Sequence, residues 1–409
     1  MSFSAALAPG APPRSRLDQA ALLALFGFVA ALQFSIAIAQ ILLTVMLLAW
    51  VALLVTRHER FSAPRLFWPL AAYAGLTLVS AACSIEPMVS FIDCKQLVLL
   101  LIVPAVYRLA RGQRALHTLM VIITVGAISA AVGIIQYSIL NYNNLGERPH
   151  GTVGHYMTYS GLLMLVIGAA LAHVLFGRKR AWSALVLPAL LVAVVLTFTR
   201  NAWVGVAAAA CVLLVLRNFR LLWVVPLVLA IGVALAPPRL TNRFYSMFSL
   251  QDPTNRDRIA MVQAGMHMIR DHPLTGVGPN MVQVVYPHYR EPDAVDPIVP
   301  HLHNVPVQIA AERGLPALAV WIWFIVVALI EVYRRLASGR DQVVSAAALA
   351  AIVAMLAAGL FEVNFGNSEF LMLFLTLITL PFAAAAGEQR QATGSGLQTA
   401  GPSGLQPEA

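Results

Sequence analysis

The chain has 409 residues, of which 59% are hydrophobic and only 11% are charged, and its mean hydropathy is +0.78. Because soluble domains carry roughly 25% charged residues, this composition excludes an ordinary soluble protein and indicates one that is solvated mostly by lipid. The formal net charge of +9 comes mainly from basic residues in short loops, so it does not indicate nucleic-acid binding.

Apolar segments of about 17 to 25 residues recur along the chain, and each is long enough to cross a bilayer core of roughly 30 Å. We therefore expect an all-α polytopic membrane protein with about twelve transmembrane helices. The predicted spans are residues 18–34, 36–56, 66–82, 96–110, 115–138, 156–176, 182–199, 201–216, 220–236, 304–333, 342–364 and 368–386.

The connecting segments are short, with one exception. No cleavage-site pattern precedes the first apolar run, so we expect a first span there and not a removed signal peptide. Residues 1–17 are expected to form a cytoplasmic N-terminal tail. Residues 237–303 form one large loop that separates transmembrane helices 1–9 (18–236) from helices 10–12 (304–386). Residues 387–409 are rich in Gly, Ser and Gln and are predicted to be a disordered cytoplasmic tail.

The basic residues orient the chain in the membrane. If the N-terminus is inside, short inner loops and the tails hold 17 of the 27 Lys and Arg residues, which leaves 27 − 17 = 10 outside. Short loops that are rich in Lys and Arg mark the cytoplasmic side of a membrane protein. Both termini are therefore predicted to be cytoplasmic, and the large loop is predicted to lie outside. The outer set is Lys95, Arg148, Arg200, Arg239, Arg243, Arg256, Arg258, Arg270, Arg290 and Arg313.

The large outer loop contains "TNRDRIAMVQAGMHMIRDHPLTGVGPN", in which Ile259, Val262, Met266 and Ile269 recur at helical spacing. This pattern predicts an amphipathic helix at the outer membrane surface, ended by Pro273 and the glycines of "GVGP". The alternative is a lid that merely closes the helix bundle.

The outer basic set is dominated by arginine, whose planar fork suits paired contacts to phosphate oxygens. Arg200, in "TFTRNAWVG", lies between two spans with almost no loop. A charge at the centre of a membrane helix costs about 2.5 to 3.5 kcal/mol, and less near an end, so a partner or a function is expected. The alternative is an arginine that snorkels to lipid phosphates.

Two further outer segments combine basic and imidazole groups. Arg148 and His150 lie in "GERPHGTVGHYMTYSG", where Gly151 and Gly154 permit close approach of a ligand; the alternative is an ordinary loop. His303 and Asn304 begin the tenth span. An imidazole accepts a proton near neutral pH, so His303 is the candidate general base, with His301 as its rival.

Other residues have less specific interpretations. Glu362 and Glu369, near the outer ends of the last spans, are interpreted as structural partners of an arginine rather than as site residues. Cys83 and Cys94 share one outer loop, where a disulfide is possible; the alternative is that each is a small buried apolar residue. No phosphate-binding loop and no Asp-x-Asp pair is present, so we expect no nucleotide, no cofactor and no metal in the catalytic step.

Four motifs together resemble the bacterial O-antigen ligase family, within the O-antigen ligase and polymerase superfamily. His303 and Asn304, nine residues "VPVQIAAER" and then Gly314 resemble the signature H-[N/S/Q]-x9-G-x-x-[G/T/Y], although Ala317 departs from its last position. "RIAMVQAGMHMIRDHPLTGVGPN", "TRNAWVG" and "RPHGTVGH" resemble the family's loop helix, mid-chain arginine and Gly-rich loop.

The resemblance implies a GT-C-like glycosyltransferase of the bacterial inner membrane with a periplasmic active site. Its donor would be a glycan on undecaprenyl diphosphate, and its acceptor a sugar hydroxyl of lipid A–core in lipopolysaccharide biosynthesis. His303 would be the base, Arg200 and Arg258 would stabilise the diphosphate, and further substrate contacts are assigned to Arg148, His150, Arg256, His301, Asn304 and Gly314.

Three alternatives remain at the level of sequence. An O-antigen polymerase would use the same donor, but no outer arginine has a glycine eleven positions later, as in the R-x10-G repeats noted for polymerases. A protein O-oligosaccharyltransferase would differ only in its acceptor. A lipid-linked glycan transporter would place ionisable groups near the middle of the membrane, whereas here they gather at the outer rim.

Overall fold

The computed structural model describes residues 16–292 and 294–398, with only the backbone of residues 388–398, and every element in this part of the chain is a helix. The α-helices are α1 (Arg16–Ala31), α2 (Ile36–Thr56), α3 (Phe67–Ala82), α4 (Pro87–Asp93), α5 (Ile102–Leu109), α6 (Gln113–Ser138), α7 (Tyr156–Phe176), α8 (Ala181–Leu196), α9 (Arg200–Asn218), α10 (Val224–Leu235), α11 (Pro238–Tyr245), α12 (Pro253–Asp271), α13 (Val282–Tyr289), α14 (Val305–Ala337), α15 (Gln342–Gly359) and α16 (Ser368–Gln398). Short 3-10 helices are η1 (Cys94–Leu101), η2 (Phe219–Trp223), η3 (Ser246–Phe248) and η4 (Asn364–Gly366).

The predicted all-α polytopic membrane fold is confirmed. Within the described residues, eight helical stretches are long and apolar enough to cross a membrane, and Phe67–Ala82 and Ala181–Leu196 are shorter apolar helices. The stretch Arg200–Leu235 contains two of the twelve predicted spans, joined by η2, and the first predicted span corresponds to the 16-residue α1. α16 runs to Gln398, beyond the predicted end of the last span at residue 386, and residues 399–409 of the predicted tail lie outside the described part.

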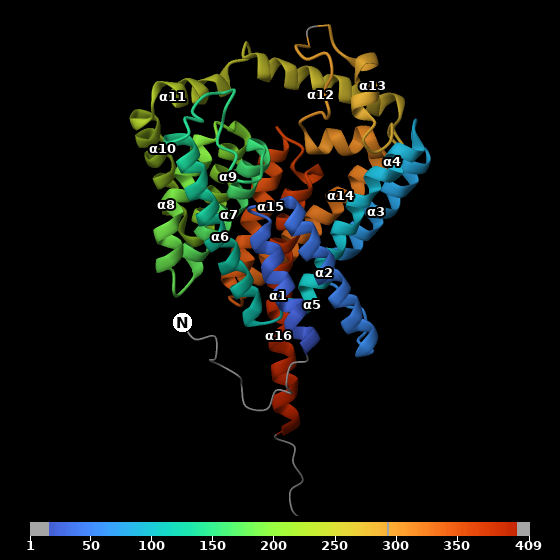
Figure 1. The fold of residues 1–409 in the computed structure, drawn as a ribbon, viewed down its shortest axis with the longest axis vertical. Helices are drawn as coiled ribbons and strands as arrows, with labels where there is room; N and C mark the ends of the chain where they lie inside the picture. The colour runs from blue at the N-terminus through green and yellow to red at the C-terminus, as the bar shows by residue number, and fades with distance from the viewer. Residues whose placement is uncertain (1–15, 293, 399–409) are drawn as a thin grey trace, which may run out of the picture.

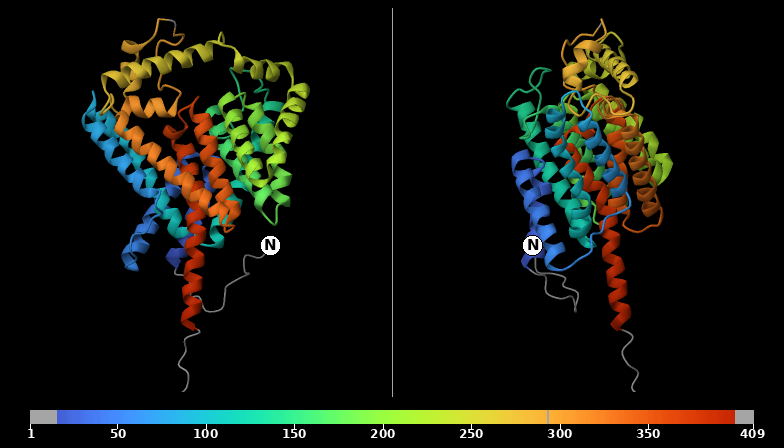
Figure 2. Two further views of the ribbon diagram at one scale, coloured as in Figure 1. Left: turned by 180° about the vertical axis from the view of Figure 1, so that it is seen from behind. Right: turned by 90° about the vertical axis from the view of Figure 1, so that its right-hand side faces the viewer.

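The helices form a bundle that is covered at one end by the large loop. Figure 1 shows α11, α12 and α13 lying across the top of the bundle, and α16 extending from the opposite end. Both views in Figure 2 show the same arrangement. α7, α15 and α16 are largely buried among the other helices, whereas none of the residues of α10 is buried.

The predicted loop helix is present as α12, and small residues form the face that packs on the protein. Ala260, Ala264 and Met268 are buried, whereas Ile259 and Met266 are 48% and 54% exposed. The small residues lie on the packed face because α12 approaches α14 closely: a Cβ on Gly265 would lie 2.5 Å from a Val307 methyl group. The larger apolar side chains therefore remain on the outer face of α12.

The loop between α12 and α13 packs against an interruption in α14. At Gly314 the backbone of α14 leaves the helical conformation, with φ 80° and ψ 167°. The carbonyls of Ala311 and Glu312 accept hydrogen bonds from the backbone N–H groups of Val277 and Gly278, at 2.9 Å each. The Leu315 N–H donates to the Pro273 carbonyl at 2.8 Å. This pairing satisfies the backbone groups that the kink frees.

Gly314 thus has a structural role at the kink, and the predicted substrate contact stays a prediction. A Cβ at this position would lie 2.1 Å from the Leu274 carbonyl oxygen, so the loop between α12 and α13 makes a close approach here. The kink separates the first part of α14, which follows His303 and Asn304, from the long part that descends through the bundle (Figure 1).

At the opposite end of the bundle, an ionic cluster joins α1, α2 and α5. The guanidinium of Arg108 donates to both carboxylate oxygens of Glu59 at 2.6 and 2.7 Å, and it lies 3.3 Å from Asp18, which also pairs with Arg57 at 2.6 Å. Bidentate geometry of this kind pairs the charges and also fixes the relative orientation of the two side chains.

Cys83 and Cys94 are free thiols in the structure, so the possible disulfide between them is absent.

Replacing Gly314 by alanine should destabilise the protein strongly, because the new methyl group meets the Leu274 carbonyl in a left-handed backbone conformation. Gly339 is the matched control: its φ is 76°, but no atom lies within 4 Å of the position that a Cβ would take there. Gly339→Ala should cost only about 1–2 kcal/mol from the backbone alone. Melting temperatures in detergent measure both, and equal shifts for the two variants would contradict the proposed role of the kink.

Candidate active site

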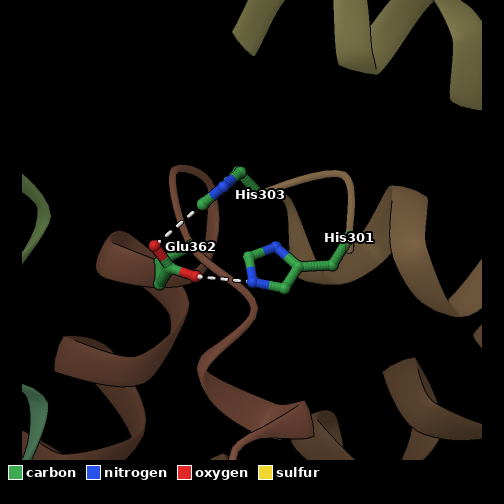
Figure 3. A group of neighbouring side chains, drawn as sticks. All are labelled: His301, His303 and Glu362. Atoms are coloured by element: carbon green, nitrogen blue, oxygen red, sulfur yellow. Dashed lines mark hydrogen bonds and ion pairs between the residues drawn. The ribbon is translucent and has the colours of Figure 1, made fainter. Parts of the chain in front are cut away.

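A buried carboxylate lies between the two histidines of "HLHN". His303 Nδ1 is 3.0 Å from Glu362 Oε2, and His301 Nε2 is 3.8 Å from Glu362 Oε1. Figure 3 shows both rings directed at Glu362, one ring toward each oxygen. The histidines come from the segment before α14, and Glu362 comes from the segment after α15. The direct contacts of Glu362 are thus the two histidines, and the predicted arginine partner acts on it only through its charge, from Arg258.

The charge on Glu362 is stabilised by its neighbours. Burial opposes ionisation, but the hydrogen bond with His303 and the electrostatic influence of His303, His301 and Arg258 outweigh it and lower the pKa of Glu362 to about 2. An ionised carboxylate only accepts hydrogen bonds, so the Nδ1 of His303 carries the proton. The Nε2 of a neutral His303 is then the nitrogen that can accept a proton.

His301 has a different environment from His303. Burial, together with the charge of His303, lowers the pKa of His301 to about 4. Its Nδ1 is buried and has no hydrogen-bond partner within the described residues. His301, His303 and Glu362 also present one ligand atom each within 4.8 Å, a grouping that fits a metal ion, although the nearby charge of Arg258 opposes a dication.

The backbone around His303 is held by local contacts. His303 has a φ of 49°, a left-handed conformation that is uncommon for a residue other than glycine. Asn304 caps α14, because its side-chain oxygen accepts from the Val307 N–H at 3.0 Å, and its amide donates to the Leu360 carbonyl at 3.1 Å. Asn304 therefore ties the histidine segment to the segment that carries Glu362.

Four arginines influence one another beside this site. Burial lowers the pKa values of Arg148, Arg243 and Arg258, and the positive charge of Arg200 lowers them further. The pKa of Arg243 falls to about 10. Asp252 is the main acidic group near them apart from Glu362, which acts on Arg258. The structure thus brings the predicted Arg148, Arg200 and Arg258 together and adds Arg243, which sequence reasoning did not assign to the site.

Arg200 already has protein partners. Its side chain is 5% exposed; Nη1 donates to the Ser246 carbonyl and hydroxyl at 3.1 and 3.0 Å, and Nη2 lies 3.2 Å from Asp252. Asp252 is also the N-cap of α12, where it accepts from the Asn255 N–H. Arg200 therefore has the partner expected for a buried charge, and it anchors the start of α12, which positions Arg258.

Arg148 and His150 also make contacts in or near their own loop. The Arg148 guanidinium stacks over the Tyr156 ring at 4.2 Å and donates to the Leu145 carbonyl. His150 contacts Tyr142 and Gly151 in its own loop. Arg256 is on α12, and Glu369 is half-buried in the first turn of α16.

The fold and this site define a multi-pass, all-α membrane protein with a His–Glu–Arg cluster beneath the large loop. A family model described as O-antigen ligase matches residues 184–322, about a third of the chain. The match supports the assignment of the chain to the O-antigen ligase family and includes three of the four motif regions, with "RPHGTVGH" outside it. It supports ligase- or polymerase-type glycosyl transfer in general. A search of curated proteins gave no match.

The low pKa of His301 predicts a loss of stability in mild acid. The folded group has a pKa of about 4, below the ordinary 6.5, so between these values the unfolded chain binds a proton that the folded protein does not. Stability contributed by neutral His301 is complete above pH 6.5 and is lost as the pH falls toward 4. Melting temperatures of wild type should fall more steeply in this window than those of His301→Gln.

The control for this measurement is His117→Gln, since His117 is exposed on α6. It should follow the wild-type curve. If His301→Gln also follows the wild-type curve, His301 is not held in its neutral form by the fold.

Proposed function

We propose that the protein is an O-antigen ligase of the bacterial inner membrane. It transfers a glycan from undecaprenyl diphosphate to a sugar hydroxyl of lipid A–core, at a periplasmic active site and without a metal. The observation that carries this proposal is the hydrogen bond between His303 and the buried Glu362, next to the cluster of Arg148, Arg200, Arg243 and Arg258. The family match and the membrane fold support it, and the overall class would be a GT-C-like transferase.

The proposed reaction is a single displacement on the donor sugar. The acceptor hydroxyl oxygen attacks the anomeric carbon while the bond between that carbon and the diphosphate oxygen breaks. The hydroxyl proton passes to Nε2 of His303, and the diphosphate leaves with the bonding electron pair. Glu362 fixes the tautomer of His303 and stabilises the imidazolium that forms, as a carboxylate does in other His–carboxylate pairs.

The arginines oppose the charge that develops on the leaving group. Arg258 is the central candidate, because it interacts electrostatically both with Glu362 and with Arg200. Arg148 and Arg243 add further positive charge to the cluster. Arg200 also contributes positive charge, although it forms an ion pair with Asp252. Guanidinium groups suit diphosphate oxygens, and a fixed donor of this kind typically contributes about 10²- to 10³-fold in rate.

The donor and the acceptor separate this proposal from its alternatives. A polymerase would use the same arginine cluster and the same base, with a second lipid-linked glycan as acceptor, and a protein glycosyltransferase would use a side-chain hydroxyl. A transporter would bind the same glycan without joining it to an acceptor.

The direct test incubates the purified protein in detergent with undecaprenyl-diphosphate glycan and lipid A–core, without nucleotide and with EDTA. Glycan should appear on lipid A–core, and His303→Ala should reduce the rate by about 10²- to 10⁴-fold, the usual contribution of general base catalysis. His267→Ala is the control, because His267 is an exposed histidine of α12. Gel mobility of the products measures transfer.

Two outcomes would contradict the proposal. Longer donor chains with an unmodified acceptor would identify a polymerase. Activity that EDTA removes and Zn²⁺ restores would assign His301, His303 and Glu362 to a catalytic metal instead.

A further inference from the structure

A cavity of about 310 Å³ with polar and apolar walls lies beside His301 and Glu362, the two neighbours of His303. His301 and Glu362 are in its wall, together with Asp93, Asn280, Arg313 and Asn364. Leucines and Phe370 line its apolar part. The volume is at the lower end of the range for small-molecule sites, about 300 to 1,000 Å³.

The charge of the cavity is opposite to that of the arginine cluster. Three carboxylates, those of Asp93, Glu312 and Glu362, line it, against a single arginine, Arg313. Arg313 is already engaged, with Nη1 2.5 Å from Glu312 and Nη2 3.8 Å from Asp93. Like charges repel, so this cavity does not suit a diphosphate, whereas it suits a neutral ligand that has many hydroxyl groups.

Several polar groups of the cavity wall have spare hydrogen-bonding capacity. Within the described residues, Asn364 Nδ2, Arg313 Nε and His301 Nδ1 are buried without a hydrogen-bond partner. The Asp93 side chain is 24% exposed, and its carboxylate faces Arg313 only at the long distance of 3.8 Å. Buried polar groups are normally paired, so the presence of three such atoms in side chains of one cavity wall favours a polar ligand that pairs with them after a small side-chain rotation.

We propose that this cavity binds the sugar ring of the acceptor that carries the attacking hydroxyl. Asp93 accepts hydrogen bonds from ring hydroxyls, Asn364 donates to them, and the attacking hydroxyl lies toward His303. The two substrates are thereby separated by charge, with the anionic donor over the arginines and the neutral acceptor ring in the cavity. This inference rests on the proposed transferase function.

Both assigned contacts can be tested by steady-state kinetics on full-length protein. Asp93→Asn and Asn364→Leu should each raise KM for lipid A–core about tenfold or more, the usual size of the effect when a hydrogen bond to a charged or buried group is lost. The KM for the undecaprenyl-diphosphate donor should stay within about twofold of wild type, because the donor binds elsewhere. A merely structural role would instead change both KM values or lower kcat alone.

One control variant and the independence of the two test variants keep the test decisive. Glu86→Gln removes an exposed carboxylate that precedes α4, outside the cavity, and should leave both KM values unchanged. Asn364→Leu loses no hydrogen bond of its Nδ2, so it is expected to fold even if Asp93→Asn is unstable. Melting temperatures report folding of each variant.

The failures of the inference and of the proposed function are distinguishable. If wild type transfers glycan to lipid A–core and neither variant changes the acceptor KM, the cavity is not the acceptor site. If wild type transfers glycan to no acceptor, the proposed function itself is wrong.

Discussion

The site depends on a negative charge that is buried at one end of a membrane bundle. Glu362 is 8% exposed, and an isolated carboxylate in such a place would take up a proton instead of remaining charged. Two imidazoles and Arg258 keep it ionised, and in return it fixes the tautomer and the direction of His303. The chemistry assigned to His303 therefore belongs to a pair of residues from two chain segments, and both segments must be held in register.

The kinked helix and the large loop provide that register. Gly314 interrupts α14, and the backbone of residues 273–278 fills the interruption, so the first part of α14 is fixed to the loop above it. Asn304 then joins the beginning of α14 to Leu360, two residues before Glu362. At the other end of the loop, Arg200 and Asp252 anchor the start of α12, which carries Arg258. The same loop thus positions the base and the cationic cluster together.

Much of this arrangement follows from sequence, because long apolar runs and a signature such as His303, Asn304 and Gly314 are local patterns. The partner of His303 was not predictable, since Glu362 lies 59 residues away and only the packing of α14 beside α15 brings the two together. Arg243 occurs in "TNRFY", which resembles no motif. The face of α12 that packs on α14 does not follow from a hydrophobicity pattern, because close packing selects the small residues Ala260, Ala264 and Gly265, whereas the larger apolar side chains dominate such a pattern.

The most direct test of the account is a double-mutant cycle on His303 and Glu362, with transfer to lipid A–core as the readout and melting temperature as the check on folding. If the two residues act as a unit, Glu362→Gln should slow transfer, and the double variant His303→Ala with Glu362→Gln should be no slower than His303→Ala alone. Losses that multiply in the double variant would show that the two residues act independently, and would contradict the role assigned to the buried carboxylate.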